Sequence, residues 1–268
     1  MKRINKTRFS IALIIFGLLL ALVVKGAVSI YGWMGNSPSD DEILPVESTE
    51  KVYYKDCGIP IPGNYSVHGI DISKHQYNIN WKQVEEMEVN GDKLSFVFIK
   101  ASEGATRNDD FFQKNWKSAG KTRLLRGAYH FFRPAKDSRT QAYLFMHQLK
   151  LKRGDLPPVV DIERGNRQTS KHIQKSLQDF LDILEHEYSV KPIIYTNLSF
   201  YTKHLAGKFE DYPIWIAYYM DDPFQLPDNR NWSFWQHSES GRVNGIRGKV
   251  DFNVFHGNIV QLKALCIK

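Results

Sequence analysis

The chain has 268 residues, a formal net charge of +7, and a composition that is 42% hydrophobic and 13% aromatic. This apolar content excludes a disordered chain, and a single long apolar stretch excludes a membrane protein with several spans. Two cysteines are too few for a disulfide-built mini-protein or a cysteine-rich zinc domain. Lysine and arginine are scattered, and no nucleic-acid motif accompanies them, so the charge does not predict nucleic-acid binding.

The first 33 residues have the pattern of an export signal. Residues 11–24 are apolar apart from Gly17, and four basic residues precede them. A helix over this stretch would rise about 21 Å, short of the roughly 30 Å of a bilayer core, although Lys25 could snorkel and residues 26–31 could extend the span. No small-x-small cleavage site follows, so we favour a signal-anchor over a cleaved signal peptide. Residues 34–268 should be exported, and an anchor would tether them to the membrane.

Residues 34–66 have the composition of a linker. Residues 34–50 hold five acids and no base, and a proline-rich run follows at residues 59–64. About 200 residues remain for a folded domain, enough for one sizeable core or one barrel. We therefore expect a signal segment at 1–33, a linker at 34–66 and a single domain at 67–268.

The folded part has the pattern of a barrel. Eight short apolar, β-branched or aromatic runs predict strands. They are residues 67–73, 96–102, 125–132, 158–163, 192–197, 214–219, 233–237 and 250–255. Helix-like segments fill the gaps after the first four, at residues 81–88, 110–119, 138–149 and 170–187. The last three strands follow one another more closely. This order predicts an irregular (β/α)5(β)3 TIM-like barrel; a doubly wound open sheet is the alternative, although no glycine-rich phosphate loop follows the first strand.

Carboxylates interrupt these apolar runs where strands end, which is where barrel enzymes place catalytic groups. Asp161 and Glu163 are two residues apart on one strand, so they share a face with Cα atoms about 6.5–7 Å apart. Two acids on a buried face repel each other, and one of them can stay protonated near neutral pH. Asp71 ends the first strand and Asp251 lies in the last, and these strands are neighbours in a closed barrel. A solvated strand end or a helix N-cap is the alternative for the Asp161–Glu163 pair, and a cap for the following turn is the alternative for Asp71.

Aromatic residues accompany the acids on the predicted strands, and flat rings suit the apolar faces of sugars. The candidates for substrate binding are Tyr129, Tyr195, Trp215, Tyr219 and Trp235. Packing in the core is the alternative for about half of them.

The chain resembles the glycoside hydrolase family 25 lysozymes, the Chalaropsis-type N-acetylmuramidases. The resemblance covers residues 67–257, and its motifs occur in the family's order. They include HGIDISKHQ (68–76), FVFIKASEG (96–104), RGAYHFFRP (126–134), GDLPPVVDIE (154–163), PIIYTN (192–197), PIWIAYY (213–219), FWQHS (234–238) and VDFNVF (250–255). It implies an irregular β/α barrel that hydrolyses the β-1,4 bond between N-acetylmuramic acid and N-acetylglucosamine in peptidoglycan.

The resemblance also implies roles for the acids. Glu163 matches the general acid, Asp161 the second carboxylate, and Asp71 and Asp251 the supporting acids. No metal or cofactor is expected. Of the glycosidase routes, we favour the one that uses the acetamide of the substrate as nucleophile.

Three readings compete with this one. The first is a peptidoglycan-binding module of the same fold without catalysis; the presence of all four acids argues against it. The second is a metal-dependent deacetylase, for which no HxxxH spacing accompanies the acids. The third is a chitinase-like barrel, whose longer acidic motif is absent.

Cys57 and Cys266 lie at opposite ends of the folded part. In an exported protein two cysteines commonly pair, and barrel closure brings chain ends together, so a disulfide between them is a candidate clasp; the alternative is two free thiols. We expect a monomer.

Overall fold

The computed structural model describes residues 51–89, 91–220 and 224–268. The predicted signal segment at 1–33, and the predicted linker up to residue 50, lie outside these residues. Among the helices that are described, none is long and apolar enough to cross a bilayer.

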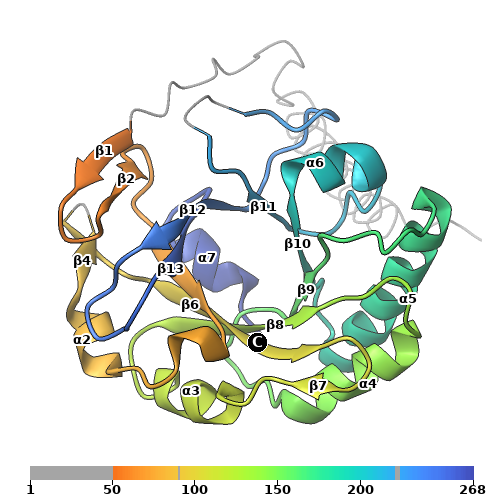
Figure 1. The fold of residues 1–268 in the computed structure, drawn as a ribbon, viewed down its shortest axis with the longest axis horizontal. Coiled ribbons are helices and arrows are strands. Elements are labelled where there is room, and N and C mark those ends of the chain that lie inside the picture. The colour runs from red at the N-terminus through yellow and green to blue at the C-terminus, as the bar shows by residue number, and fades with distance from the viewer. Residues whose placement is uncertain (1–50, 90, 221–223) are drawn as a thin grey trace, which may run out of the picture. The chain divides into compact units, whose positions relative to one another are not determined.

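Eight strands close into a barrel (Figure 1). They are β3 (His68–Ile72), β6 (Phe96–Glu103), β8 (Leu125–Phe131), β9 (Val159–Asp161), β10 (Ile193–Asn197), β11 (Ile214–Ala217), β12 (Phe234–Gly241) and β13 (Val250–Phe255). The hydrogen-bonded order is β3-β13-β12-β11-β10-β9-β8-β6, and pairing of β3 with β6 closes the ring. The strands are parallel except for β13, which is antiparallel to both of its neighbours. The predicted (β/α)5(β)3 barrel is confirmed.

Helices follow the first five barrel strands. They are α2 (Trp81–Glu86), α3 (Phe112–Ala119), α4 (Ser138–Gln148), α5 (Ser170–Tyr188) and the short α6 (Leu198–Phe200), which continues into the π-helical turn η2 (Tyr201–Leu205). The four predicted helices are present. The helix α2 ends two residues earlier than expected because β4 (Glu88–Val89) pairs with β5 (Asp92–Lys93).

The N-terminal caps of these helices agree with local sequence. The Thr169 side chain accepts a hydrogen bond from the backbone N–H of His172 at the start of α5, and Asp137 caps α4 through Thr140 in the same way. Two smaller elements complete the layout: the 3-10 turn η1 (Lys74–Gln76) after β3, and the strand β7 (Arg107–Asn108), which pairs with the end of β6.

The inside of the barrel is filled by aromatic side chains. Phe96, Phe98 and Phe234 are fully buried, and their rings pack against one another with centroids 5.4 to 5.7 Å apart. Glycine makes room for them: a Cβ on Gly69 would lie 2.4 Å from the Phe96 ring, and one on Gly127 would lie 2.4 Å from the Phe98 ring. A second apolar layer separates the barrel from its helices.

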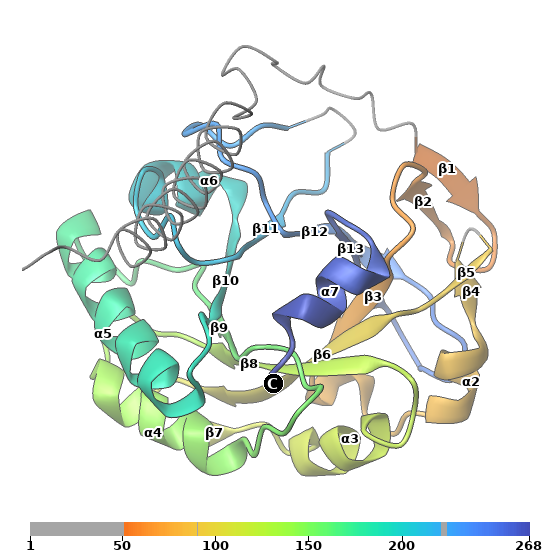
Figure 2. The ribbon, with the colours of Figure 1, turned by 180° about the vertical axis from the view of Figure 1, so that it is seen from behind.

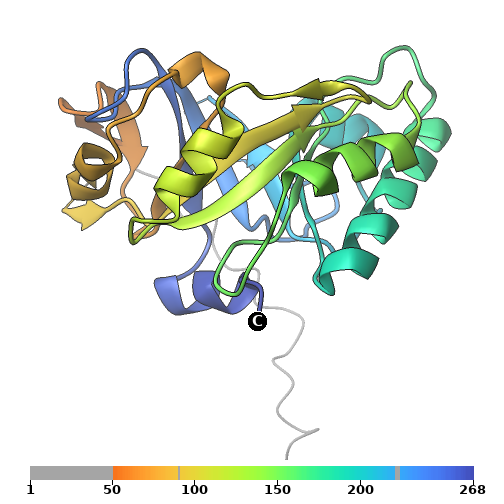
Figure 3. The ribbon, with the colours of Figure 1, turned by 90° about the horizontal axis from the view of Figure 1, so that it is seen from below.

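A C-terminal helix that the sequence did not predict, α7 (Ile259–Leu265), covers one end of the barrel (Figures 2 and 3). Its Leu262, together with Cys266, belongs to the same interior cluster as Phe96. The opposite end of the barrel therefore remains as the open mouth.

The folded part begins before residue 67. Within the predicted linker, β1 (Lys51–Tyr54) and β2 (Ile59–Pro62) form an antiparallel hairpin. Ile59 and Ile61 are buried, and the hairpin lies beside β12 (Figure 1). These two isoleucines alternate with prolines, so the run that resembles a linker is a strand with one apolar face.

Of the two alternatives for the cysteines, a disulfide or two free thiols, the structure has two free thiols. Cys57 and Cys266 are both buried, and both are free thiols. Cys57 packs in the outer apolar layer beside the hairpin, whereas Cys266 lies in the interior cluster under α7. The two ends of the domain thus pack against different parts of the barrel.

Candidate active site

A pocket opens at the mouth of the barrel, where the carboxyl ends of its parallel strands meet. It brings together eight of the nine predicted residues. They are Asp71, Tyr129, Asp161, Glu163, Tyr195, Trp215, Tyr219 and Asp251. Residues from both ends of the sequence therefore line one cavity.

Asp161 ends β9, and Glu163 follows two residues later. Both line the pocket, while Ile162 between them is buried in the outer apolar layer, as alternation along an extended chain requires. Burial, followed by the negative charge of Glu163 and a hydrogen bond between the two carboxyl groups, raises the pKa of Asp161 well above its usual range. Asp161 therefore holds a proton more readily than an isolated aspartate does.

Asp71 and Asp251 form a second carboxyl pair. Because β13 is antiparallel to β3, the start of β13 lies at the mouth, and Asp251 stands directly opposite Asp71. Burial raises the pKa of Asp71 to about 6 and that of Asp251 to about 9; the charge of Asp71 adds to the shift on Asp251. Each of the two carboxyl groups therefore holds a proton more readily than an isolated aspartate does.

Two side-chain amides keep Asp71 ionised. Its Oδ2 accepts hydrogen bonds from Nδ2 of Asn253 at 2.8 Å and from Nε2 of Gln236 at 2.7 Å. Asn253 is itself held, since Nε1 of Trp215 donates to its Oδ1 at 2.8 Å. These donors stabilise the carboxylate form and offset part of the desolvation that raises the pKa.

The Gln236 amide also connects two predicted sugar-binding tyrosines to the acids. The hydroxyl groups of Tyr195 and Tyr219 donate to its Oε1, at 2.8 Å and 2.5 Å. Tyr195 is buried, whereas Tyr219 is 44% exposed at the rim. The tyrosine rings are thus fixed in place by the same network that orients Asp71.

The sequence profile described as "Glycosyl hydrolases family 25" matches residues 70–246. The chain belongs to this family. Among its relatives, protein YegX of Escherichia coli (strain K12) is 43% identical over 212 residues, 78% of this chain and 77% of that protein. Lysozyme M1 of Streptomyces globisporus is 33% identical over 213 residues, 74% of this chain and 71% of that protein. The solved structure of a family 25 glycosyl hydrolase from Bacillus anthracis superposes with a TM-score of 0.70 at 31% identity, covering 81% of this chain and 98% of that one.

One predicted site residue of this family 25 barrel lies elsewhere. Trp235 is buried outside the barrel, where its ring packs against Trp232, Phe224 and Tyr65 with centroids 5.5 to 6.3 Å apart. On β12 the side chains alternate, so Trp235 points away from the pocket while Gln236 points into it. Trp235 is therefore not among the residues that line this pocket, and its role in substrate binding stays a prediction.

Two residues that the sequence analysis missed are the amides Gln236 and Asn253. The period of two that placed Asp161 beside Glu163 also places Asn253 on the same face as Asp251, and Gln236 on the same face as the interior Phe234. The pattern could therefore have identified both. Nothing comparable marks the other lining residues Ser73 and His75, at the turn η1, or Glu239, near the end of β12.

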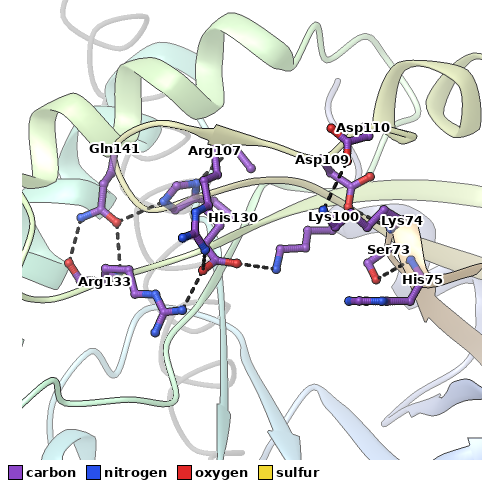
Figure 4. A network of polar contacts seen from close by, with 12 residues as sticks. Ser73, Lys74, His75, Lys100, Arg107, Asp109, Asp110, His130, Arg133 and Gln141 are labelled. Atoms are coloured by element: carbon purple, nitrogen blue, oxygen red, sulfur yellow. Dashed lines mark hydrogen bonds and ion pairs between the residues drawn. The ribbon is translucent and has the colours of Figure 1, made fainter.

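An ion-pair network borders the family 25 pocket (Figure 4). Lys100 lines the pocket, and its Nζ lies 2.9 Å from Oε2 of Glu103; Nη2 of Arg133 lies 2.7 Å from Oε1 of the same carboxylate. Although burial opposes the shift, the hydrogen bonds from Arg133 and Lys100 lower the pKa of Glu103 to about 2. Glu103 is therefore a fixed anion, and it has no proton to contribute to catalysis.

Within the described part of the chain, no group of three or more histidine, cysteine, aspartate or glutamate side chains is arranged to hold a metal ion.

Proposed function

We propose that this glycoside hydrolase is a peptidoglycan muramidase, a lysozyme that cleaves the β-1,4 bond between N-acetylmuramic acid and N-acetylglucosamine. The observation that carries the proposal is the meeting of Asp161 and Glu163 with Asp71 and Asp251 in one aromatic-lined pocket, where burial and the charge of Glu163 raise the pKa of Asp161. Family membership and the lysozyme among the relatives support it.

Glu163 is the general acid. It transfers its proton to the glycosidic oxygen as the bond from that oxygen to the anomeric carbon breaks, and its carboxylate later takes a proton from the attacking water.

Asp161 positions the acetamide of the substrate. Its Oδ1 is buried and accepts no hydrogen bond from any described residue. An acetamide N–H would satisfy this oxygen and favour the ionised form of Asp161, which leaves the shared proton on Glu163. The acetamide oxygen would then attack the anomeric carbon, and the resulting ring would be opened by water.

Asp71 and Asp251 keep a single negative charge beside this pair. That charge favours the positive charge that develops on the sugar ring and on the acetamide in the transition state. Tyr129 lines the pocket as an uncharged phenol, because burial and the charges of Asp71 and Asp161 raise its pKa well above the usual range.

The N-terminal segment fits the same function. Residues 1–33 would export the domain to the wall and, as a signal-anchor, hold it at the membrane. The domain would act as a monomer on glycan strands, since one barrel supplies every residue of the pocket.

Mass spectrometry of the fragments released from purified peptidoglycan tests the proposal. Muramic acid at the new reducing ends is expected; glucosamine there would point to a glucosaminidase, and no cleavage would favour a binding module. Glu163→Gln should lower the rate at least a hundredfold, because an amide has no proton to donate. Near-full activity of that variant would refute the assignment.

A further inference from the structure

A second cleft adjoins the active-site pocket. It is lined by residues that include Glu103, Arg107, Arg133, Lys136 and Asn166. The same three strand ends supply both cavities. Near the end of β6, Lys100 lines the pocket and Glu103 lines the cleft. At the end of β8, Phe131 lines the pocket and Arg133 lines the cleft. After β9, Glu163 lines the pocket and Asn166 lines the cleft. A ligand in the pocket thus has the cleft directly beside it.

The ring of Phe131 lines the pocket and contacts one cation from each of the two cavities. Nζ of Lys100 lies 4.9 Å from its centroid, and the guanidinium carbon of Arg133 lies 4.5 Å from it. This stacking, with the ion pairs to Glu103, holds Arg133 in a fixed position at the border (Figure 4). The wall of the cleft is therefore preorganised.

The cleft carries excess positive charge. Its charged residues are three cations and one anion, and the anion, Glu103, already pairs with Arg133 and Lys100. Arg107 is 76% exposed and lies 3.5 Å from the same carboxylate, a long contact that leaves most of its donors open to solvent. Lys136 is exposed and has no side-chain ion pair within the described residues. Such a surface suits an anion.

We propose that this cleft binds the carboxylates of the peptide branch that the muramic acid of the substrate carries. The inference rests on the proposed muramidase function. The sugars of the wall glycan are uncharged where a peptide is attached, so the free carboxylates lie in the branch. A branch leaving the sugar beside Glu163 would meet the cations of the cleft, whose lining includes Asn166 on the same loop as Glu163.

The test compares two substrates: glycan strands with their peptides, and strands from which an amidase has removed the peptides. The variant is Arg107→Gln with Lys136→Gln, which removes two cations and keeps Arg133 in its network. The matched control is Lys150→Gln with Arg153→Gln, which removes two exposed cations from the loop before β9, at the closed end of the barrel. The readout is the ratio of kcat/KM for peptide-bearing strands to that for stripped strands.

The cleft variant should lower this ratio about three- to tenfold, mainly through KM, because each exposed ion pair changes binding by up to about fivefold. The control should leave the ratio within twofold of wild type. Converting the peptide carboxylates to amides should lower the wild-type ratio to that of the variant. An unchanged ratio in the cleft variant overturns the inference, and so does a fall of equal size in the control variant. Either result leaves the proposed muramidase function in place as long as the wild type cleaves the strands. A wild type that cleaves neither substrate overturns both.

Discussion

Asn253 offers the sharpest test of how the Asp71 carboxylate is held. Asn253→Leu removes the 2.8 Å hydrogen bond to Asp71 and leaves Nε1 of Trp215 without its acceptor, in a fully buried position. A hydrogen bond to a charged group contributes about 1.5–3 kcal/mol, and a buried donor left unpaired costs about 1–3 kcal/mol. The free energy of unfolding should therefore fall by about 3–5 kcal/mol.

Thr196→Val is the matched control. Thr196 is also fully buried, but its hydroxyl has no hydrogen-bond partner among the described residues. Replacing it by a methyl group of the same shape should leave stability unchanged or raise it by about 1 kcal/mol. Urea denaturation of wild type and both variants measures the difference. A loss of stability below about 1 kcal/mol for Asn253→Leu would refute this account of the network. A loss for Thr196→Val that equals the loss for Asn253→Leu would refute it as well.

Three further predictions concern packing, acid stability and substrate contact. Asp155→Ala removes the carboxylate that Arg126, whose side chain is 8% exposed, contacts at 2.8 Å. The free energy of unfolding, measured by urea denaturation, should fall by about 3–5 kcal/mol. A fall of less than about 1 kcal/mol would contradict a buried ion pair. Burial lowers the pKa of His68 to about 4, so the folded state binds fewer protons than the unfolded state below pH 6.5. The stability present above pH 6.5 should be lost as the pH falls toward 4, and His68→Phe should flatten this dependence in urea midpoints; an unchanged slope would exclude His68 as a source. Trp215→Phe should lower kcat/KM at least tenfold, and Trp235→Phe should lower it less than twofold. Of these two tryptophans, only Trp215 lines the pocket and donates a hydrogen bond to Asn253. Equal effects would contradict the assigned orientations.

The parts of the site that lie on a single strand could be predicted from the sequence. Alternation places Asp161 and Glu163 on one face with no knowledge of the rest of the fold. The position of Asp251 at the mouth depends instead on β13 running antiparallel, which strand spacing alone does not determine. For Trp235 the hydrophobic pattern was ambiguous, since both faces of β12 are buried and only the register to β11 and β13 decides which face lines the barrel.

The fold was predictable in its repeating part and less so at its ends. Strand and helix alternate with regular spacing from β3 to β10, and local pattern suffices there. The β1–β2 hairpin has only two buried isoleucines, which alternate with two prolines, so its composition is that of a linker until β12 is present to pack against. The helix α7 could not be predicted for the same reason, because its short apolar face is buried only by contact with the closed barrel.

The pairing of β3 with β13 has a consequence for the time at which activity arises. Asp71 and Asp251 meet only when the last strand of the barrel joins the first, 182 residues apart at the Asp71–Asn253 contact. A chain that emerges N-terminus first has the Asp161–Glu163 pair long before it has β13, but it has neither a closed pocket nor the amides that hold Asp71. Pairing over such a separation is a slow step. The four acids and the two amides that hold Asp71 therefore come together only when β13 pairs with β3.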